Sequence, residues 1–184
     1  MAKKKGKKGK KDTTTTLPVL TTLRIESARL DALNPRLGDS FTSTILKRQN
    51  SLELIEQRIQ RSAVQQSTSL YLQHMSLHNL SILSQYCGEL QHVIEIDFSR
   101  NELFASVEVF EALSPLTSLQ KLNLSYNSLN GTLNIPKDTL VNIEELILDS
   151  NQFTAIGTSV HELSKMKRFS IANNSIKGKI IIAL

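Results

Sequence analysis

The residue types that most often carry chemistry are few in this chain and widely separated. It has four histidines, at positions 74, 78, 92 and 161, and no pair of them has the spacing with Cys or a carboxylate that metal sites use. The single cysteine, Cys87, lies in the Leu-rich segment LSILSQYCGEL, with no His or acid placed to activate its thiol. We therefore expect Cys87 to be a buried core thiol, and no catalytic site, metal or cofactor.

Lysines form the densest cluster of functional groups. Residues 1–12 carry seven lysines and one aspartate, a net charge of +6, so the other residues carry 5 − 6 = −1. Such a segment has nothing to bury, and we expect residues 1–16 to be a disordered tail that contacts a polyanion: nucleic acid, anionic lipid or an acidic protein surface. A solubilising or targeting tail is the alternative. No aromatic residue or Arg lies between the lysines, so this segment offers no side chain on which a nucleic-acid base could stack. The lysines are Lys3, Lys4, Lys5, Lys7, Lys8, Lys10 and Lys11.

A repeated pattern indicates the elements that would position any site. The stretch LQKLNLSYNSL, residues 119–129, reads L-x-x-L-x-L-x-x-N-x-L, and the same apolar offsets recur three more times. The recurring asparagines, 26, 24 and 23 residues apart, are Asn101, Asn127, Asn151 and Asn174. This period and pattern are the signature of leucine-rich repeats.

Each repeat combines a short strand with a sharp turn. Leu122 and Leu124 alternate with polar residues, which predicts a strand with one buried face. The asparagine follows at the turn, where its side chain can bond backbone groups that would otherwise be buried unpaired. The four asparagines are thus predicted to be a structural ladder. The fold class is an α/β leucine-rich repeat solenoid, with parallel strands on the concave face and helical or irregular returns on the convex face.

The remaining segments divide the chain into four parts. We predict a disordered tail at 1–16, an extended linker at 17–43, an N-terminal capping helix at 44–66, and a leucine-rich repeat domain of about four to five repeats at 67–184. In the first repeat Met75 stands where the asparagine should be. A calmodulin-type motif at Ile59–Gln60 is a weaker reading of the helix, because the downstream Arg and Gly are missing.

The return segments differ from repeat to repeat. Residues 80–90 and 106–116 favour helices, the second ending near Pro115. Residues 130–140 contain Gly131 and Pro136 and favour irregular structure or one 3-10 turn, and 159–166 favour a short helix. After Asn174 a complete repeat would need more residues than KGKIIIAL supplies, so the last repeat is expected to form an edge strand or to be covered by a partner.

The strand residues between the buried leucines define the predicted partner surface. One column, at 95, 121, 145 and 168, alternates in charge and is expected to pair mutually across the strands. Two carboxylates of this face are about 10 Å apart, too far for paired acid–base chemistry. Aromatic and Arg residues with an exposed Ile are typical interface anchors. The predicted partner-binding set is Asp97, Arg100, Asn123, Tyr126, Ile147 and Asp149.

Cysteine usage and hydropathy bound the compartment. A single cysteine allows no disulfide within the chain, and the basic start is followed by a Thr-rich stretch rather than an apolar signal region. No run is long enough and apolar enough to span a membrane. We expect an intracellular protein, in the cytoplasm or on the cytoskeleton, with the nucleus as the alternative.

The four repeats resemble intracellular leucine-rich repeat proteins, and this resemblance covers about residues 67–184. Together with the Lys-rich start and the segments SLYLQHMSLHNL and VIEIDFSRNEL, they are similar to small ciliary and axonemal leucine-rich repeat proteins. This similarity implies a non-catalytic scaffold or adaptor in a cytoskeletal assembly, with other proteins of a larger complex as partners and the Lys tail on acidic tubulin tails, and no small-molecule substrate. The alternatives are a nuclear or ribonucleoprotein-associated protein, and a regulatory subunit that binds an enzyme through its concave face.

Overall fold

The structure is a computed structural model that describes the backbone of residues 39–177 and the side chains of residues 51–177. The chain divides into two compact units, Met1–Leu46 and Lys47–Leu184, and the boundary falls within the long helix α2 (Asp39–Gln65). The predicted Lys-rich tail, residues 17–38 of the linker and the segment 178–184 lie outside the described residues.

Helix α2 is longer than predicted. It begins at Asp39 rather than at residue 44, so the last five residues of the expected extended linker are helical. The reason is visible in the sequence: Gly38 is the last helix-breaking residue, and no Gly or Pro follows until the helix ends. Its inward stripe is also narrower than expected, because Ile55 and Ile59 are buried whereas Leu52 and Leu54 are exposed.

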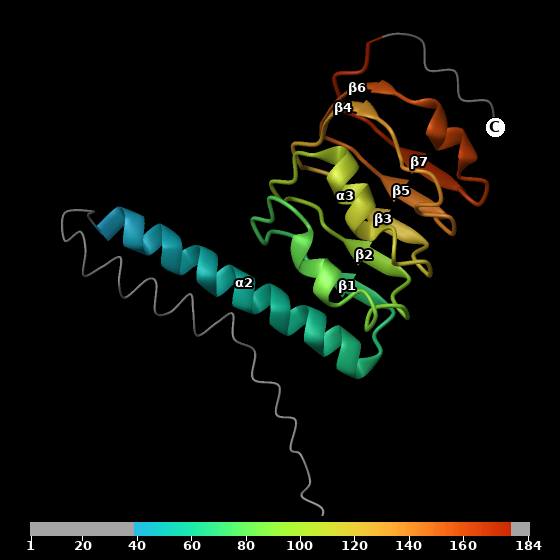
Figure 1. Cartoon of the computed structure of the whole chain (residues 1–184). Coiled ribbons are helices and arrows are strands. Elements are labelled where there is room, and N and C mark those ends of the chain that lie inside the picture. Colours follow the sequence, from blue (N-terminus) through green and yellow to red (C-terminus); the bar gives the residue numbers. More distant parts are fainter. Residues whose placement is uncertain (1–38, 178–184) are drawn as a thin grey trace, which may run out of the picture. The chain divides into compact units, whose positions relative to one another are not determined.

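Five short strands form a parallel sheet (Figure 1). In spatial order they are β1 (Ser69–Tyr71), β2 (Glu95–Asp97), β3 (Lys121–Asn123), β5 (Glu145–Ile147) and β7 (Arg168–Ser170). Because each new strand is added beside the previous one, the order in space follows the order in the sequence. Equivalent positions of successive repeats are paired, so Ile96 lies opposite Leu70 and Leu122. The middle residue of each strand therefore enters one continuous core.

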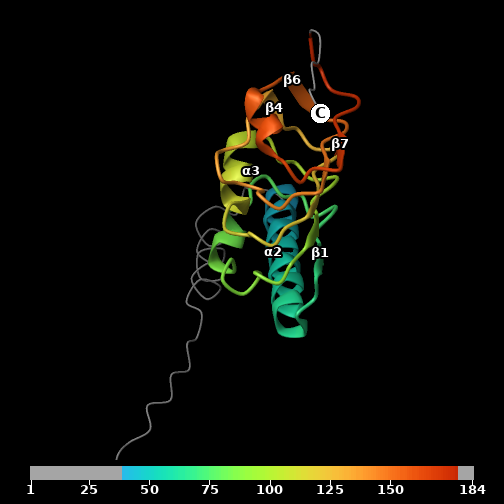
Figure 2. The ribbon, with the colours of Figure 1, turned by 90° about the vertical axis from the view of Figure 1, so that its right-hand side faces the viewer.

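The returns lie across the core from the strands. Figure 2 shows α3 (Ser106–Leu113) on the side opposite β1 and β7. This helix was predicted, and it buries Val109, Phe110 and Leu113. The segments predicted to be helical at 80–90 and 159–166 form only short 3-10 helices, η1 (Ser81–Gln85) and η2 (Thr158–Glu162).

A second sheet takes up the start of the return at 130–140, which was predicted to be irregular; residues 134–140 contain no helix or strand, in agreement with that prediction. Strand β4 (Asn130–Leu133) pairs in parallel with β6 (Gln152–Ile156). Gly131 has φ of +77°, a conformation open to glycine, and the register shifts at this point. The glycine that suggested a break in regular structure thus marks an irregularity inside a strand pair.

Candidate functional site

The outward side of the five-stranded sheet, which we call the strand face, carries two columns of side chains in register. Glu95, Lys121, Glu145 and Arg168 make one column, and Asp97, Asn123, Ile147 and Ser170 make the next. All are half-buried except Lys121 and Arg168, which are exposed. A shallow hollow of about 140 Å³ lies among these residues on β2, β3 and β5. The sheet thus brings Asp97, Asn123 and Ile147 together on neighbouring strands.

The expected alternation of ion pairs along the first column is incomplete. Arg168 pairs with Glu145 at 2.7 Å, but no carboxylate among the described residues lies within ion-pair distance of Lys121. Glu95 instead accepts a hydrogen bond from the Ser69 hydroxyl at 3.5 Å. Since exposed pairs contribute little net free energy, Lys121 gains little by leaving water. Lys121 is therefore an exposed positive charge without an ion-pair partner among residues 51–177.

Three of the predicted partner-binding residues also organise the backbone where the strands end. Asp97 Oδ1 accepts the Ser99 N–H at 2.8 Å, and Asn123 Oδ1 accepts the Ser125 N–H at 3.0 Å. Asp149 accepts from the following repeat, with the Ala172 N–H at 2.7 Å. These side chains therefore have a structural role besides any contact with a partner.

Four asparagines, which we call the asparagine ladder, connect each repeat to the one before it: Asn101, Asn127, Asn151 and Asn174. In Asn127, Oδ1 accepts the Leu103 N–H at 3.1 Å, and Nδ2 donates to the carbonyls of Phe98 and Leu124 at 3.1 and 3.0 Å. The other three make the equivalent bonds. The first three are buried and Asn174 is half-buried. Each amide pairs backbone groups that the turn removes from the sheet.

The residue before each ladder position has a left-handed backbone. The same holds in the first repeat, where Met75 takes the ladder position, and all five φ angles lie between 54° and 58°. The residues are His74, Arg100, Tyr126, Ser150 and Asn173. The left-handed region costs Gly no conformational energy and costs Asn and Asp less than other residues. For most other side chains it is unfavourable.

Two of these five left-handed residues contact each other. The Arg100 guanidinium lies over the Tyr126 ring, 4.5 Å from its centroid. Tyr126 is 51% exposed, and Arg100 is also exposed. The stack joins two neighbouring repeats at the ends of β2 and β3. An exposed aromatic ring with a guanidinium held over it is a preformed contact for another molecule.

The residues considered for catalysis are far from this stack in the sequence and have other contacts. His78 Nδ1 lies 3.2 Å from a Glu102 oxygen, a pair that sequence reasoning did not predict. Cys87 is half-buried rather than fully buried, and its thiol donates to the Leu83 carbonyl at 3.1 Å. Burial raises the pKa of the Cys87 thiol, which disfavours the nucleophilic thiolate. No cluster of metal-binding side chains occurs in the described part of the chain.

Sequence reasoning missed a second polar ladder, on the return side. Gln91 donates to the Pro115 carbonyl, Asn142 donates to the Thr117 carbonyl, and the Lys165 ammonium donates to the Asn142 amide oxygen. The positions 91, 117, 142 and 165 are 26, 25 and 23 residues apart, close to the period of the asparagines. That spacing was a usable signal. It was hidden because the residue type changes from repeat to repeat.

Comparison with known proteins supports the repeat. A family model described as Leucine Rich Repeat matches residues 118–138, the segment that contains β3 and β4. No curated protein matches the chain. The match and the parallel strands fit a leucine-rich repeat fold, and domains of this class generally mediate protein–protein interaction and are typically non-catalytic. None of the described helices could cross a membrane.

Proposed function

We propose that this chain is a non-catalytic adaptor that holds a protein partner against the strand face, with the Arg100–Tyr126 stack as the anchor. The observation that carries the proposal is the placement of the stack. Arg100 and Tyr126 occupy left-handed positions with φ of 56° and 55°, where Asn would fit the backbone better. Each bulky residue costs about 1 kcal/mol there. The exposed stack returns only about 0.5–1 kcal/mol to the fold.

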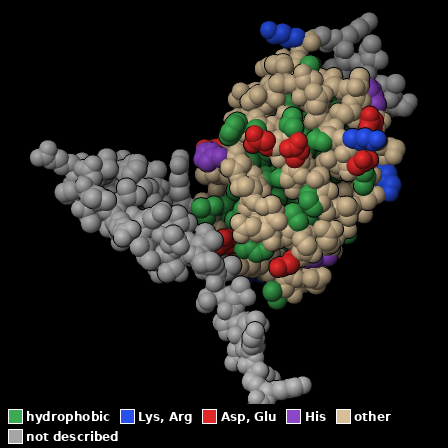
Figure 3. Space-filling model, viewed as in Figure 1, with side chains coloured by type: hydrophobic (Ala, Val, Ile, Leu, Met, Phe, Trp, Pro, Cys, Tyr) green, Lys and Arg blue, Asp and Glu red, His purple; other side chains and the backbone are tan. Residues whose placement is uncertain are grey.

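The surroundings of the stack suit an interface. Tyr and Arg are enriched among the residues that dominate binding energy, and such residues act best when weaker contacts around them exclude water. Ile147, half-buried beside the shallow hollow, supplies an apolar contact. Polar contacts around Ile147 come from Glu95, Asp97 and Lys121, which has no ion-pair partner among the described residues. On the side that carries α3, by contrast, exposed apolar side chains are scattered rather than gathered (Figure 3).

The proposal includes a role for the last half of α2 as a cap on the first repeat of a solenoid. Ile55 and Ile59 are buried in the common core. The Arg58 guanidinium donates to the Tyr71 carbonyl at 2.9 Å, and the Ser51 hydroxyl reaches the Met75 carbonyl at 3.4 Å. The helix thereby supplies apolar surface and donors where the first repeat has no preceding repeat. Terminal repeats require such cover.

We place the adaptor in a cytoskeletal assembly, of the axonemal or ciliary kind. The support is the resemblance in sequence and the net charge of +6 in residues 1–12, which suits the acidic tails of tubulin. Deleting residues 2–11 should then reduce microtubule co-sedimentation at low salt while leaving circular dichroism of the repeat domain unchanged. Unchanged co-sedimentation would contradict this setting, and a loss of RNA binding instead would favour the ribonucleoprotein alternative.

The anchor itself is tested by substitution to Asn. Tyr126→Asn and Arg100→Asn remove the stack but suit the left-handed backbone, so the fold should persist. Ser150→Asn changes the equivalent position of the next repeat and is the matched control. In quantitative affinity capture from the native cell, both stack variants should lose the same set of partners, and the control should retain it. Equal capture by all three variants would overturn the anchor.

A further inference from the structure

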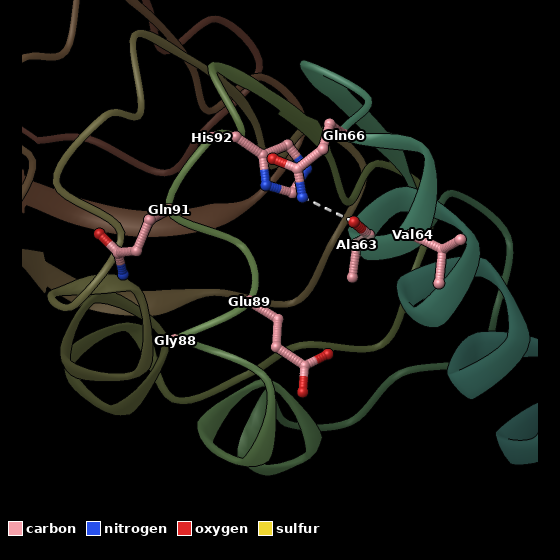
Figure 4. Close-up of a pocket in the computed structure, with 7 residues that line it drawn as sticks. All are labelled: Ala63, Val64, Gln66, Gly88, Glu89, Gln91 and His92. Carbon is pink, nitrogen blue, oxygen red and sulfur yellow. Dashed lines mark hydrogen bonds between the residues drawn. The ribbon is translucent and has the colours of Figure 1, made fainter.

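A hollow of about 570 Å³ lies at the end of α2, away from the strand face. One wall is the last turn of the helix, with Ala63 and Val64, and the other is the segment 88–92 that follows η1 (Figure 4). The two walls are joined by a hydrogen bond of 3.2 Å between His92 Nε2 and the Ser62 carbonyl. Since a carbonyl only accepts, the His92 ring carries its proton on Nε2 in this contact.

The helix wall is apolar, yet it ends in an unpaired acceptor. Val64 is 84% exposed, more than any other large apolar side chain of the described residues. The carbonyl of Val64, a residue that lines the hollow, accepts no hydrogen bond from the described part of the chain. A helix C-terminus carries a partial negative charge of about half an elementary charge on such groups. The wall therefore favours a ligand with an aliphatic stem and a cationic end.

The opposite wall carries a full negative charge. The Glu89 side chain extends from this wall, and Figure 4 shows its carboxylate free of the other labelled side chains. Within residues 51–177, no Lys or Arg lies at ion-pair distance from Glu89. An apolar ligand would leave Glu89 without a partner, and an acidic ligand would be repelled. Both walls thus select for positive charge.

We propose that this hollow binds a Lys or Arg side chain presented by a protein partner. The aliphatic stem packs on Ala63 and Val64, and the charged end donates to the Glu89 carboxylate and to the Val64 carbonyl. Arg fits best, because its five donors can serve acceptors on both walls at once. The site is separate from the strand face, so the partner contact proposed there can fail without affecting this one.

The test uses the full chain labelled with ¹⁵N and titrated with N-acetyl-arginine methylamide, a single basic residue without peptide charges. Saturable shifts are expected at the amides of Val64, Gln66 and Gly88. N-acetyl-norleucine methylamide, which has the stem without the charge, should bind much more weakly. Glu89→Gln should weaken binding about threefold or more, as expected for a partly exposed ion pair. Equal binding of the two probes, or an unchanged affinity in Glu89→Gln, would overturn the site.

Gly88 provides an occlusion variant. A Cβ at this position would meet nothing within 4 Å, and its φ lies outside the left-handed range, so Gly88→Leu should fold and fill the hollow. It is expected to abolish the saturable shifts. Glu111→Gln removes an exposed carboxylate from α3 and is the control that should leave them unchanged. Binding that survives Gly88→Leu and falls in Glu111→Gln would instead show nonspecific attraction to surface carboxylates.

The chain itself contains candidate basic residues in its first twelve positions. Deleting residues 2–11 distinguishes an internal ligand from an external one. Tighter binding of the arginine probe by the shortened chain would identify the chain's own lysines as a competing occupant. Unchanged affinity would leave a basic residue of another protein as the occupant. The first result would overturn a protein partner as the occupant, and the second would support it.

Discussion

The ladder positions and the residues just before them differ sharply, although they are neighbours in every turn. From the second repeat onward the ladder position is always Asn, and each one bonds the backbone of two repeats. The preceding position has the same left-handed backbone in every repeat, yet five different side chains fill it. At the ladder position the backbone geometry and the residue type are both the same from the second repeat onward, which shows that the fold needs Asn there. At the preceding position the backbone geometry is the same but the residue type varies, so the fold does not determine the side chain there.

The difference guides the search for function. At the left-handed positions the fold would be served best by Gly or Asn, and only Asn173 follows that preference. Arg100 and Tyr126 depart from it furthest, and they are the two that contact each other. Local conflicts with backbone preference concentrate at functional sites. The stack is therefore a better candidate for recognition than the asparagines, although the asparagines are the stronger sequence signal.

The largest predicted effect comes from breaking the ladder in the middle of the sheet. Asn127→Ala removes hydrogen bonds to Leu103, Phe98 and Leu124 and leaves buried backbone groups unpaired. At about 1–3 kcal/mol for each unsatisfied group, we expect a loss of roughly 3 kcal/mol or more in the free energy of unfolding. Urea denaturation followed by circular dichroism measures it. Asn174→Ala, at the half-buried end of the ladder, should cost clearly less, and equal losses would contradict the dependence on burial.

The exception in the first repeat provides the next prediction. Met75 takes the ladder position, and its N–H bonds Asn101 Oδ1. Met75→Asn extends the ladder by one amide. In the described part of the chain, however, α2 rather than a repeat precedes Met75, so the acceptor that each ladder amide finds in the preceding repeat is missing. Burying an unsatisfied amide should cost about 2 kcal/mol. A gain in stability on denaturation would show that Asn is favourable even without a repeat before it.

The sequence predicted most of the repeat geometry because that geometry has a strong local signal. Alternation placed Leu122 on the buried face, and the recurring apolar offsets placed its equivalents there too. The strands pair Leu70, Ile96, Leu122 and Leu146 in that register. The returns were harder. Gly131 suggests a break in structure, but parallel pairing with β6 keeps the chain extended, and no local pattern reports a partner 22 residues away. The early start of α2 escaped detection because residues 39–43 have no apolar stripe.

For the candidate site, the sequence suggested partner-binding residues but not the contacts that the structure shows between them. Arg100 and Tyr126 were both selected as anchors, and their separation of one repeat places them in neighbouring repeats, but this spacing does not report that the guanidinium lies over the ring. Both residues of that contact have left-handed backbones, which the sequence did not indicate. The prediction that Lys121 forms an ion pair was wrong. Charge alternation does not report the hydration and side-chain entropy that a solvated lysine loses when it is held in a pair.

A small gain in stability should follow from matching residue to backbone at a left-handed position without other contacts. Ser150 has φ of 56°, and its side chain makes no hydrogen bond with the described residues. Because Asn tolerates this region better than Ser, Ser150→Asn should raise the free energy of unfolding by about 0.5 kcal/mol. Thermal denaturation can resolve the shift. A loss of stability would contradict the view that these positions are free of other structural demands.

The smallest effect is the coupling inside the stack, which a double-mutant cycle isolates. In each single variant, Arg100→Asn or Tyr126→Asn, the relief of backbone strain stabilises the fold and the loss of the contact destabilises it. These two contributions should nearly cancel, so each single variant should unfold with almost the original free energy. The double variant relieves both strains but loses the contact once. We therefore expect a coupling of about 0.5 kcal/mol between the two positions in the free energy of unfolding. Additive changes would show that the contact contributes nothing to folding, and that Arg100 and Tyr126 are stacked without stabilising the turns that carry them.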